Sequence, residues 1–481
     1  MMSLHVHLQR NPRSSSSQAM NNQLESTPSP ALRLAVISDL DGTLHQGGLL
    51  DERHHFCTEI APRLTSLMAH GARVVAITGN CLAAVTHRSL RWIVETLVEE
   101  ERLFLLPQFQ IYANNGATRV AFSAADPDLR ELFDLNRTGA LTSHEAFDRL
   151  VRCRGPADVE LMPRFVDCEY LLGTRIREEE ARSVSRILEE AAREYDANVL
   201  GPSVAGLRCR GTGTTTRCEV RASFPTDDQG TPKSPSVVHR RVLCGKDMAP
   251  QAVTSQLTLK PVLTNHHLTT PRDVDPRNAL VASIQKLLDE ANLGHLEATP
   301  GGRTSIDISK RGVDKGAALR DAIGRTGVRG DPRRGERFGE HCLYLGDEIL
   351  ERGGNDEPVS RVAGVLTVSV GRGCPAPSRR GVITLPRGLH GPAAAAWILA
   401  RLCAGIEKLP APLVLPSLRQ ELVRDNIHAS LDAWIVGGGS AAVLENLNLL
   451  LARIRCGDEA ARDALALAVK DARDETHRRA S

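Results

Sequence analysis

The chain has 481 residues, with 60 Lys+Arg against 58 Asp+Glu and a net charge of +2. This length suggests about three domains, and the balanced charge argues against a protein that binds polyanions by bulk charge. Hydrophobic residues make up 41% of the chain, which excludes a wholly disordered protein. With nine Phe, four Tyr and three Trp, the chain has too few rings for a single-strand nucleic-acid stacking platform.

The cysteines and the N-terminal residues give information about the cellular compartment. Eleven cysteines are scattered from Cys57 to Cys456 without a Cys-x-x-Cys pair, which is typical of free thiols in the cytoplasm. No apolar run approaches the roughly 18 residues of a membrane-spanning helix, so no membrane partner is expected. Residues 1–30 are Ser-rich and acid-poor; a disordered tail is predicted, with a transit peptide as the alternative.

The first predicted elements alternate between strand and helix. The aliphatic run Leu32–Ser38 predicts a buried strand, and Arg73–Ile77 predicts a second. Helices are predicted at Glu59–His70, closed by Gly71, and at Leu82–Glu101. Strand, helix and strand in so short a compass indicate a parallel sheet.

The middle of the chain has a different pattern and predicts a separate α+β domain over residues 118–302. Helices are predicted at Glu178–Tyr195 and Pro276–Ala291. Between them lie a strand candidate, Thr214–Phe224, and a breaker-rich loop, Asp227–Ser236.

The parallel pattern is then predicted to resume. Arg303–Ile308, Cys342–Leu345 and Val362–Val370 are strand candidates, with a helix at Asp314–Ile323. From Pro392 onward the sequence is almost wholly helical in pattern and shows no chemical motif. The predicted class is therefore α/β, with an inserted α+β domain and a helical C-terminal extension.

Polar groups follow the first two predicted strands. Asp39 and Asp41 lie two residues apart, so a side chain and a backbone carbonyl can face one metal ion. One carboxylate can act as nucleophile while the other transfers protons. The hydroxyl of Thr78 and the backbone N–H groups of Gly79 and Asn80 can hold phosphate oxygens. The alternative in both places is an ordinary polar turn.

Two later segments complete the set. Asp314 suits a helix N-cap, which places Lys315 in the first turn, where a cation opposes the helix dipole. Such a local conflict is typical of a functional residue, although a solvated surface lysine is the alternative. Asp347 follows a strand and precedes Asn355 and Asp356, an oxygen-rich set that suits Mg²⁺, with an acidic loop as the alternative.

Taken in order, the Asp pair, the Thr, the Lys and the acidic pair resemble the haloacid dehalogenase superfamily of phosphotransferases. The resemblance covers residues 31–117 and 303–392, which it implies form a Rossmann-like catalytic core. The 237 residues from Thr78 to Lys315 leave room for a cap at 118–302, and its α+β pattern resembles the C2B type of subfamily IIB. The helical extension 393–481 has no counterpart in the families considered.

A narrower resemblance concerns the substrate. The stretch from residue 301 to Lys315 and the metal motif are similar to eukaryotic-type phosphomannomutases and to sugar-phosphate phosphatases. It implies that Ser305 and Asp307 contact a sugar. Arg221 is the candidate for a cap contact with phosphate, together with Arg208, Arg210 and Arg217; solvated strand residues are the alternative.

The resemblance implies a Mg²⁺-dependent phosphatase that hydrolyses a phosphorylated sugar or similar small metabolite through an aspartyl-phosphate on Asp39. Asp41 would be the acid and base. The implied metal ligands are Asp39, Asp41 and Asp347, with Asn355 and Asp356 behind them; the implied phosphate ligands are Thr78, Gly79, Asn80 and Lys315. A phosphohexomutase on the same core and a non-enzymatic scaffold are the alternatives. Nucleic acid is not an expected partner, and monomer and homodimer both remain open.

Overall fold

The computed structural model describes ten segments and one isolated residue. They are residues 33–45, 56–155, 158–195, 236–244, 251–260, 277–301, 305–351, 353–371, 381–385, 388–437 and residue 462. Arg208, Arg210, Arg217, Arg221 and the strand predicted at Thr214–Phe224 lie outside the described residues, as do the N-terminal tail and most of the chain after Gly437.

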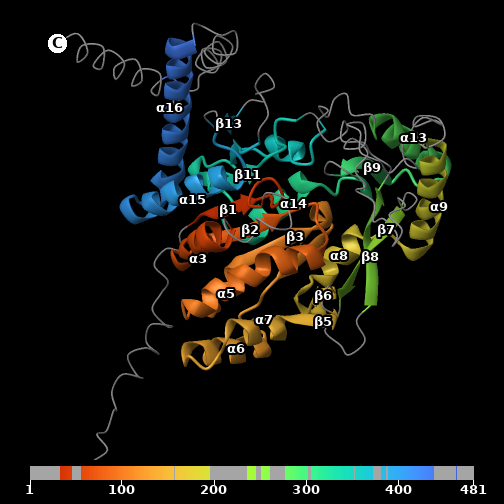
Figure 1. Cartoon of the computed structure of the whole chain (residues 1–481), viewed down its shortest axis with the longest axis horizontal. Coiled ribbons are helices and arrows are strands. Elements are labelled where there is room, and N and C mark those ends of the chain that lie inside the picture. The colour runs from red at the N-terminus through yellow and green to blue at the C-terminus, as the bar shows by residue number, and fades with distance from the viewer. Residues whose placement is uncertain are drawn as a thin grey trace, which may run out of the picture.

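A seven-stranded sheet forms the centre of the molecule, in the order β13-β12-β11-β1-β2-β3-β4 (Figure 1). All neighbouring pairs are parallel except β3 and β4. The strands are β1 (Ala35–Ser38), β2 (Arg73–Ile77), β3 (Phe109–Ala113), β4 (Thr118–Ala121), β11 (Cys342–Gly346), β12 (Leu366–Ser369) and β13 (Val382–Thr384). The predicted α/β class with a parallel sheet is confirmed.

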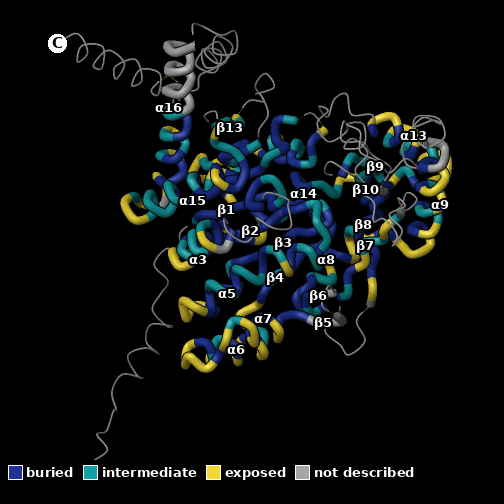
Figure 2. The backbone as a smooth tube through the Cα atoms, viewed as in Figure 1, coloured by how far each residue is buried: buried dark blue, intermediate teal, exposed yellow. Residues whose placement is uncertain are grey.

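Alternate side chains of the central strands enter two hydrophobic clusters, one on each face. On β1, Val36 belongs to the larger cluster and Ile37 to the other, as expected for a strand buried on both sides. The central strands are largely in the buried colour in Figure 2. The larger cluster takes in α3 (Ala61–Ala69), α5 (Arg91–Glu99), α6 (Pro127–Arg137), α7 (Ser143–Leu150), α15 (Gly391–Lys408) and α16 (Ala411–Gly437). The opposite face is covered by α14 (Lys315–Arg325).

Short helical turns complete this region. Leu82–Val85 (α4), the π-helical turn Thr86–Leu90 and α5 run on continuously, and Phe56–Ile60 precedes α3. Single 3₁₀ turns lie at Leu103–Gln108, Asn114–Gly116, Pro163–Phe165, Pro332–Arg334 and Glu357–Arg361. The small hairpin of β5 (Val151–Gly155) and β6 (Asp158–Leu161) leads to α8 (Cys168–Thr174).

A second, antiparallel sheet of four strands has the order β7-β8-β10-β9. The strands are β7 (Ser236–Cys244), β8 (Gln251–Lys260), β9 (Leu296–Gly301) and β10 (Ser305–Lys310). The helices α9 (Glu178–Tyr195) and α13 (Arg277–Glu290) cover one face and form a separate hydrophobic cluster with it (Figure 1). We call its opposite, polar face, which bears Arg240, Gln256, Thr258 and Asp307, the polar sheet face.

The structure corrects three sequence predictions. The strand predicted at Arg303–Ile308 is β10 of the antiparallel sheet, because Ile306 and Ile308 enter the cluster under α9 and α13. Conversely, the first part of the expected inserted domain belongs to the core. Its strand β4 extends the seven-stranded sheet, and α6 to α8 pack on the hydrophobic cluster of that sheet. Finally, α15 and α16 bury Leu399, Leu402 and Leu418 against the same core rather than forming a separate extension. No helix among the described residues is long and apolar enough to cross a membrane.

Candidate active site

The site lies at the carboxyl ends of β1, β2 and β11, where parallel strands bring distant chain segments together. Asp39 directly follows β1, and its backbone N–H donates to the Leu345 carbonyl of β11 at 2.9 Å. Its side chain is buried at 3% exposure. A carboxylate held this far from water needs a charged partner, which the N-terminus of α14 supplies.

Lys315 is the first residue of α14 and is 1% exposed. Asp314 caps the helix by accepting from the Ala317 N–H at 2.6 Å, as the sequence predicted. The ammonium of Lys315 lies 2.7 Å from Asp39 Oδ1 and 2.8 Å from Asp356 Oδ1. Burial alone would lower the pKa of Lys315, but the two carboxylates outweigh it and raise the pKa, so the lysine stays charged.

Asp356 is fully buried and holds Lys315 from the far side. Its Oδ1 also accepts from the Tyr344 hydroxyl at 2.8 Å, and its Oδ2 accepts from the Glu348 N–H at 3.2 Å. Asn355 adds a hydrogen bond from Lys315 Nζ to its Oδ1 at 3.2 Å. The structure therefore places Asn355 and Asp356 on Lys315, which fixes the ammonium in front of Asp39.

Asp347 follows β11 and completes a group of three carboxylates. One oxygen each from Asp39, Asp347 and Asp356 lies within 4.8 Å of the others. Gly42 permits this approach: it has φ +76°, and a Cβ there would lie 2.2 Å from Asp347 Oδ2. Both the positive φ and the close approach of Asp347 thus explain why a glycine occupies this position.

The electrostatics of this group suit a divalent cation. Burial is the main reason that the pKa of Asp39 is raised to about 8, with Lys315 opposing the shift and Asp356 adding to it. Burial and the neighbouring Asp39 and Asp356 carboxylates also raise the pKa of Asp347. When ionised, the three carboxylates and Lys315 leave two uncompensated negative charges on oxygen ligands. The side chains present therefore fit Mg²⁺.

Asp41 sits apart from this group, with a side chain that is 42% exposed. Asn80 Nδ2 donates to Asp41 Oδ2 at 2.5 Å, and Arg88 Nη1 lies 3.5 Å from Oδ1. Two segments that follow β2 thus orient the carboxyl group toward solvent-accessible space. Asp41 thus lies two residues after Asp39 with a partly exposed carboxyl group, and its role as acid and base stays a prediction.

The turn after β2 is the next wall of the site. Thr78 is buried and accepts the Asn80 N–H on its hydroxyl at 3.1 Å. A Cβ on Gly79 would lie 2.9 Å from Asn115 Oδ1 and 3.6 Å from Asn355 Nδ2. The turn is therefore packed against Asn355, which itself contacts Lys315. Asn355 thus links the Thr78–Asn80 turn to Lys315, while the phosphate site expected at Thr78, Gly79, Asn80 and Lys315 stays a prediction.

Asn115 links this turn to the second sheet. Its backbone N–H donates to the Thr78 carbonyl at 2.9 Å, and its Nδ2 donates to Asp307 Oδ2 at 3.0 Å. Asp307 is 3% exposed and also accepts from Thr258 Oγ1 at 2.8 Å. Burial raises the pKa of Asp307, against the opposing effects of Arg240 and Thr258. Both oxygens of Asp307 are thus occupied by protein donors.

Ser305, the other predicted sugar contact, donates its hydroxyl to the Gly301 carbonyl at 2.7 Å. The buried Arg277 fixes the same strand by donating from Nη1 to the Ser305 carbonyl at 2.7 Å. Ser305 and Asp307 therefore lie on the polar sheet face with intramolecular partners. Arg221, predicted to assist them, lies outside the described residues.

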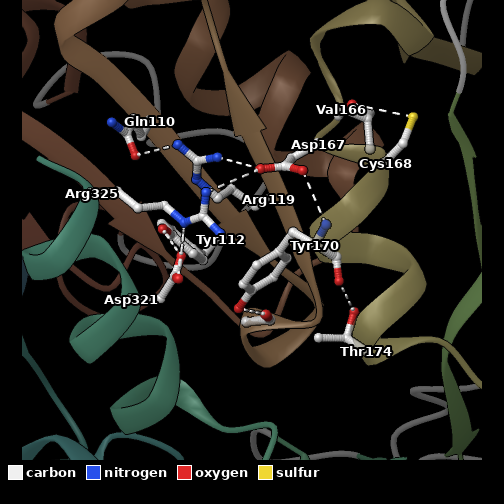
Figure 3. A network of polar contacts seen from close by, with 11 residues as sticks. Gln110, Tyr112, Arg119, Val166, Asp167, Cys168, Tyr170, Thr174, Asp321 and Arg325 are labelled. Atoms are coloured by element: carbon white, nitrogen blue, oxygen red, sulfur yellow. Dashed lines mark hydrogen bonds and ion pairs between the residues drawn. The ribbon is translucent and has the colours of Figure 1, made fainter.

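A polar network anchors α14 and with it Lys315 (Figure 3). The Tyr112 hydroxyl on β3 donates to Asp321 Oδ2 at 2.7 Å, and Arg325 Nε donates to the same carboxylate at 2.9 Å. Arg119 on β4 pairs with Asp167 at the start of α8. The network ties α14 to the sheet edge and to the chain leading into the second sheet.

A cavity of about 330 Å³ lies beside the Thr78–Asn80 turn. Cys81, Leu82 and Asn114 line it from the core, and Leu161 from the β5–β6 hairpin. Arg240 and Thr258 line it from the polar sheet face. A small molecule whose phosphoryl group occupies the turn therefore has room for its remainder between the two sheets.

Sequence reasoning missed Arg88, Asn115 and Tyr344. The Asn114-Asn115-Gly116 run after a strand is a turn signal, and both asparagines have φ +54°. That pattern could have drawn attention to Asn115. Tyr344 is hidden inside an aliphatic strand, and Arg88 has no distinguishing neighbour in the sequence.

No protein-family model matches the sequence, and no curated protein sequence matches it. Solved structures align in part. N-terminally truncated IMP-nucleotidase from Plasmodium falciparum is 11% identical with a TM-score of 0.38, and the alignment covers 70% of this chain and 66% of that one. Its IMP-bound form is 12% identical with a TM-score of 0.39, over 70% and 64%. This chain thus spans just under two thirds of those proteins.

Trehalose-6-phosphate phosphatase from Aspergillus fumigatus is 16% identical with a TM-score of 0.37, over 77% of this chain and 93% of that one. Given such low identities and TM-scores, the chemistry of the site is interpreted from its own geometry. That geometry offers a buried carboxylate beside a fixed ammonium, a group of three carboxylates that could hold a cation, and a partly exposed carboxylate at Asp41.

Proposed function

We propose that this protein is a phosphatase of the haloacid dehalogenase superfamily, dependent on Mg²⁺ and acting on a phosphorylated sugar or similar small metabolite. One observation supports this most strongly: Lys315 is buried between Asp39 and Asp356, with Asp347 beside them, at the ends of β1 and β11. A buried ion pair of this kind is costly for stability alone, which favours a role in chemistry.

Asp39 is the proposed nucleophile. Its carboxylate attacks phosphorus in line, forms an aspartyl-phosphate and displaces the alcohol of the substrate. Lys315 holds the attacking carboxylate in place and balances charge on the transferred group. With a raised pKa of about 8, Asp39 depends on nearby positive charge to be ionised at neutral pH.

Asp41 is the proposed acid and base. It gives a proton to the departing alcohol oxygen and then takes one from the water that cleaves the aspartyl-phosphate, so the carboxyl returns to its first state. Asn80 and Arg88 keep the side chain turned to the ligand. The Thr78 hydroxyl and the Gly79 N–H bind phosphoryl oxygens, and the Asn80 N–H, which donates to Thr78 Oγ1 in this structure, must turn from it to join them.

Mg²⁺ bound by Asp39, Asp347 and the Asp41 carbonyl would offset the repulsion between the carboxylates and the phosphoryl group.

Residues 176–310 are the proposed cap, since the second sheet has its own hydrophobic cluster; this is smaller than the 118–302 expected from the sequence. The cysteines whose side chains are described, Cys81, Cys168, Cys244, Cys342 and Cys403, are free thiols, which supports a cytoplasmic location.

The test is turnover of a panel of phosphorylated sugars by the wild type and by Asp39→Asn. The amide keeps the shape of the buried side chain, so we expect folded protein with at least a 1,000-fold loss of turnover. Asp134→Asn removes an exposed carboxylate on α6 and serves as the control. Substantial Mg²⁺-dependent turnover in folded Asp39→Asn would overturn the proposal.

A further inference from the structure

The guanidinium of Arg240 lies on the polar sheet face, and the proposed chemistry gives it no role. Arg240 lies on β7 and lines the 330 Å³ cavity between the two sheets. Its Nε donates to Thr258 Oγ1 at 2.8 Å, which fixes the plane of the guanidinium. Among the described residues, no carboxylate forms an ion pair with it.

The neighbouring arginine shows what a structural role looks like. Arg241 points to the helix-covered side, where its Nη2 lies 2.8 Å from Glu178 Oε1 on α9. Thus two consecutive arginines on one strand face opposite ways, and only Arg241 has a carboxylate partner within the described part of the chain. The charge of Arg240 calls for a different partner.

A β-bulge and its hydrogen bonds fix the backbone at Arg240. The β7–β8 pairing shifts register between Arg240 and Arg241, leaving Ser255 as the extra residue of a bulge. Ser255 Oγ donates to the Arg240 carbonyl at 3.0 Å and accepts from Asn114 Nδ2 at 2.9 Å. Bulges of this kind re-aim side chains beside active sites. Here the bulge is tied directly to the core, at the residue that follows β3.

A chain of contacts connects Arg240 to the phosphate turn. Thr258 contacts both Arg240 and Asp307, Asp307 contacts Asn115, and Asn115 packs on Gly79. The carboxyl of Asp307 is the nearest acidic group along this chain. Burial raises the pKa of Asp307 and the charge of Arg240 is the largest opposing effect, so the two groups interact without forming a direct ion pair.

We propose that Arg240 binds a second anionic group on the substrate, so that the protein selects phosphomonoesters bearing a further phosphate or a carboxylate. The two Nη groups offer the forked pair of donors that both anions accept. Leu82, Leu161 and Val242 give the cavity apolar walls, beside which an ion pair is stronger than in open water. The inference rests on the proposed function in that the first phosphoryl group occupies the Thr78–Asn80 turn.

Calorimetric titration tests this proposal in the Asp39→Asn background, which removes turnover. Glucose 6-phosphate, glucose 1,6-bisphosphate and 6-phosphogluconate serve as probes with no second anion, a phosphate and a carboxylate. We expect one of the last two to bind at least tenfold more tightly than the monophosphate. Arg240→Gln should abolish that preference and change monophosphate affinity less than twofold. Arg240→Lys, which keeps the charge without the fork, should retain part of the preference.

The exposed Arg182 on α9 provides the control, since Arg182→Gln removes the same charge from the same unit and should leave the preference intact. Equal affinities for all three probes, or a preference that survives in folded Arg240→Gln, would overturn the role of Arg240. If the preference is present but the wild type hydrolyses none of the probes, the phosphatase proposal fails while the anion site stands.

Discussion

Two polar regions of the molecule, connected through Asn115, are organised in opposite ways. Around Lys315, Asp39 and Asp356 each lie 2.7–2.8 Å from the ammonium, and Asp347 adds to a negative surplus. On the polar sheet face, Asp307 is engaged by neutral donors, and Arg240 has a hydroxyl rather than a carboxylate as its partner. We propose that the first region binds a cation and acts on phosphorus, and that the second binds a charged group of the ligand.

The largest predicted effect follows from removing the buried charge of Lys315. Lys315→Met leaves Asp39 and Asp356 buried without a counter-charge, so we expect loss of turnover and a stability loss of about 3–5 kcal/mol. Chemical denaturation measures the change. Lys286→Met on the exposed surface of α13 is the control, expected within about 0.5 kcal/mol. A Lys315→Met protein as stable as this control would refute the account of the buried ion pair.

The next prediction concerns the approach of Asp347 to Gly42. Gly42→Ala places a Cβ 2.2 Å from Asp347 Oδ2 and should weaken Mg²⁺ activation by about tenfold or more, roughly 1.4 kcal/mol. Titration of activity with Mg²⁺ gives the apparent affinity. Gly335→Ala has nearly the same backbone strain, at φ +75°, but an open neighbourhood. Equal shifts in the two variants would mean that the close approach has no role.

A further prediction concerns how the free energy of unfolding changes at acid pH. His45 is buried, stacks on Phe56 with ring centroids 4.4 Å apart, and has its pKa lowered to about 4 mainly by that burial. The unfolded chain therefore binds the proton more readily, and stability is full above about pH 6.5 and falls as the pH drops toward 4. The expected loss is about 3 kcal/mol.

The measurement is the free energy of unfolding between pH 4 and 7. His45→Gln should flatten this dependence, because the titrating group is gone. His144→Gln, at an exposed position on α7, should leave it unchanged. A slope that persists in the His45 variant would assign the acid sensitivity to another group.

The smallest predicted effect concerns the link between the two regions. Asn115→Gly removes the hydrogen bond to Asp307 but tolerates φ +54°, whereas Asn115→Ala loses both. We expect the alanine variant to be about 1 kcal/mol less stable than the glycine variant, measured as the difference in unfolding free energy. Equal stabilities would show that the left-handed backbone at this position is not constrained.

Much of the fold could be predicted where the structure of a segment depends mainly on its own sequence. Arg73–Ile77 is a strand with the predicted bounds, and Asp314 caps the helix of Lys315. The placement of β10 was also readable: Ile306 and Ile308 alternate with Ser305, Asp307 and Ser309, a period typical of a strand with one apolar face. Treating it as a parallel strand overlooked that alternation.

What could not be predicted depends on contacts between distant segments. Asn115 meets Asp307 across 192 residues, and Tyr344 meets Asp356 only after the chain turns back on itself. Arg240 stands out from Arg241 only once the bulge and Glu178 are seen in three dimensions. The residue types around the site were foreseeable, but their partners were not.

The central claim is that Asp39 becomes phosphorylated. Wild-type protein is mixed with Mg²⁺ and a turned-over phosphomonoester, quenched in acid within milliseconds, and the modified peptide is identified by mass spectrometry. The account predicts a phosphoryl group on Asp39 that disappears in Asp39→Asn. Turnover with no phosphorylated residue, or with the group on any other side chain, would contradict it.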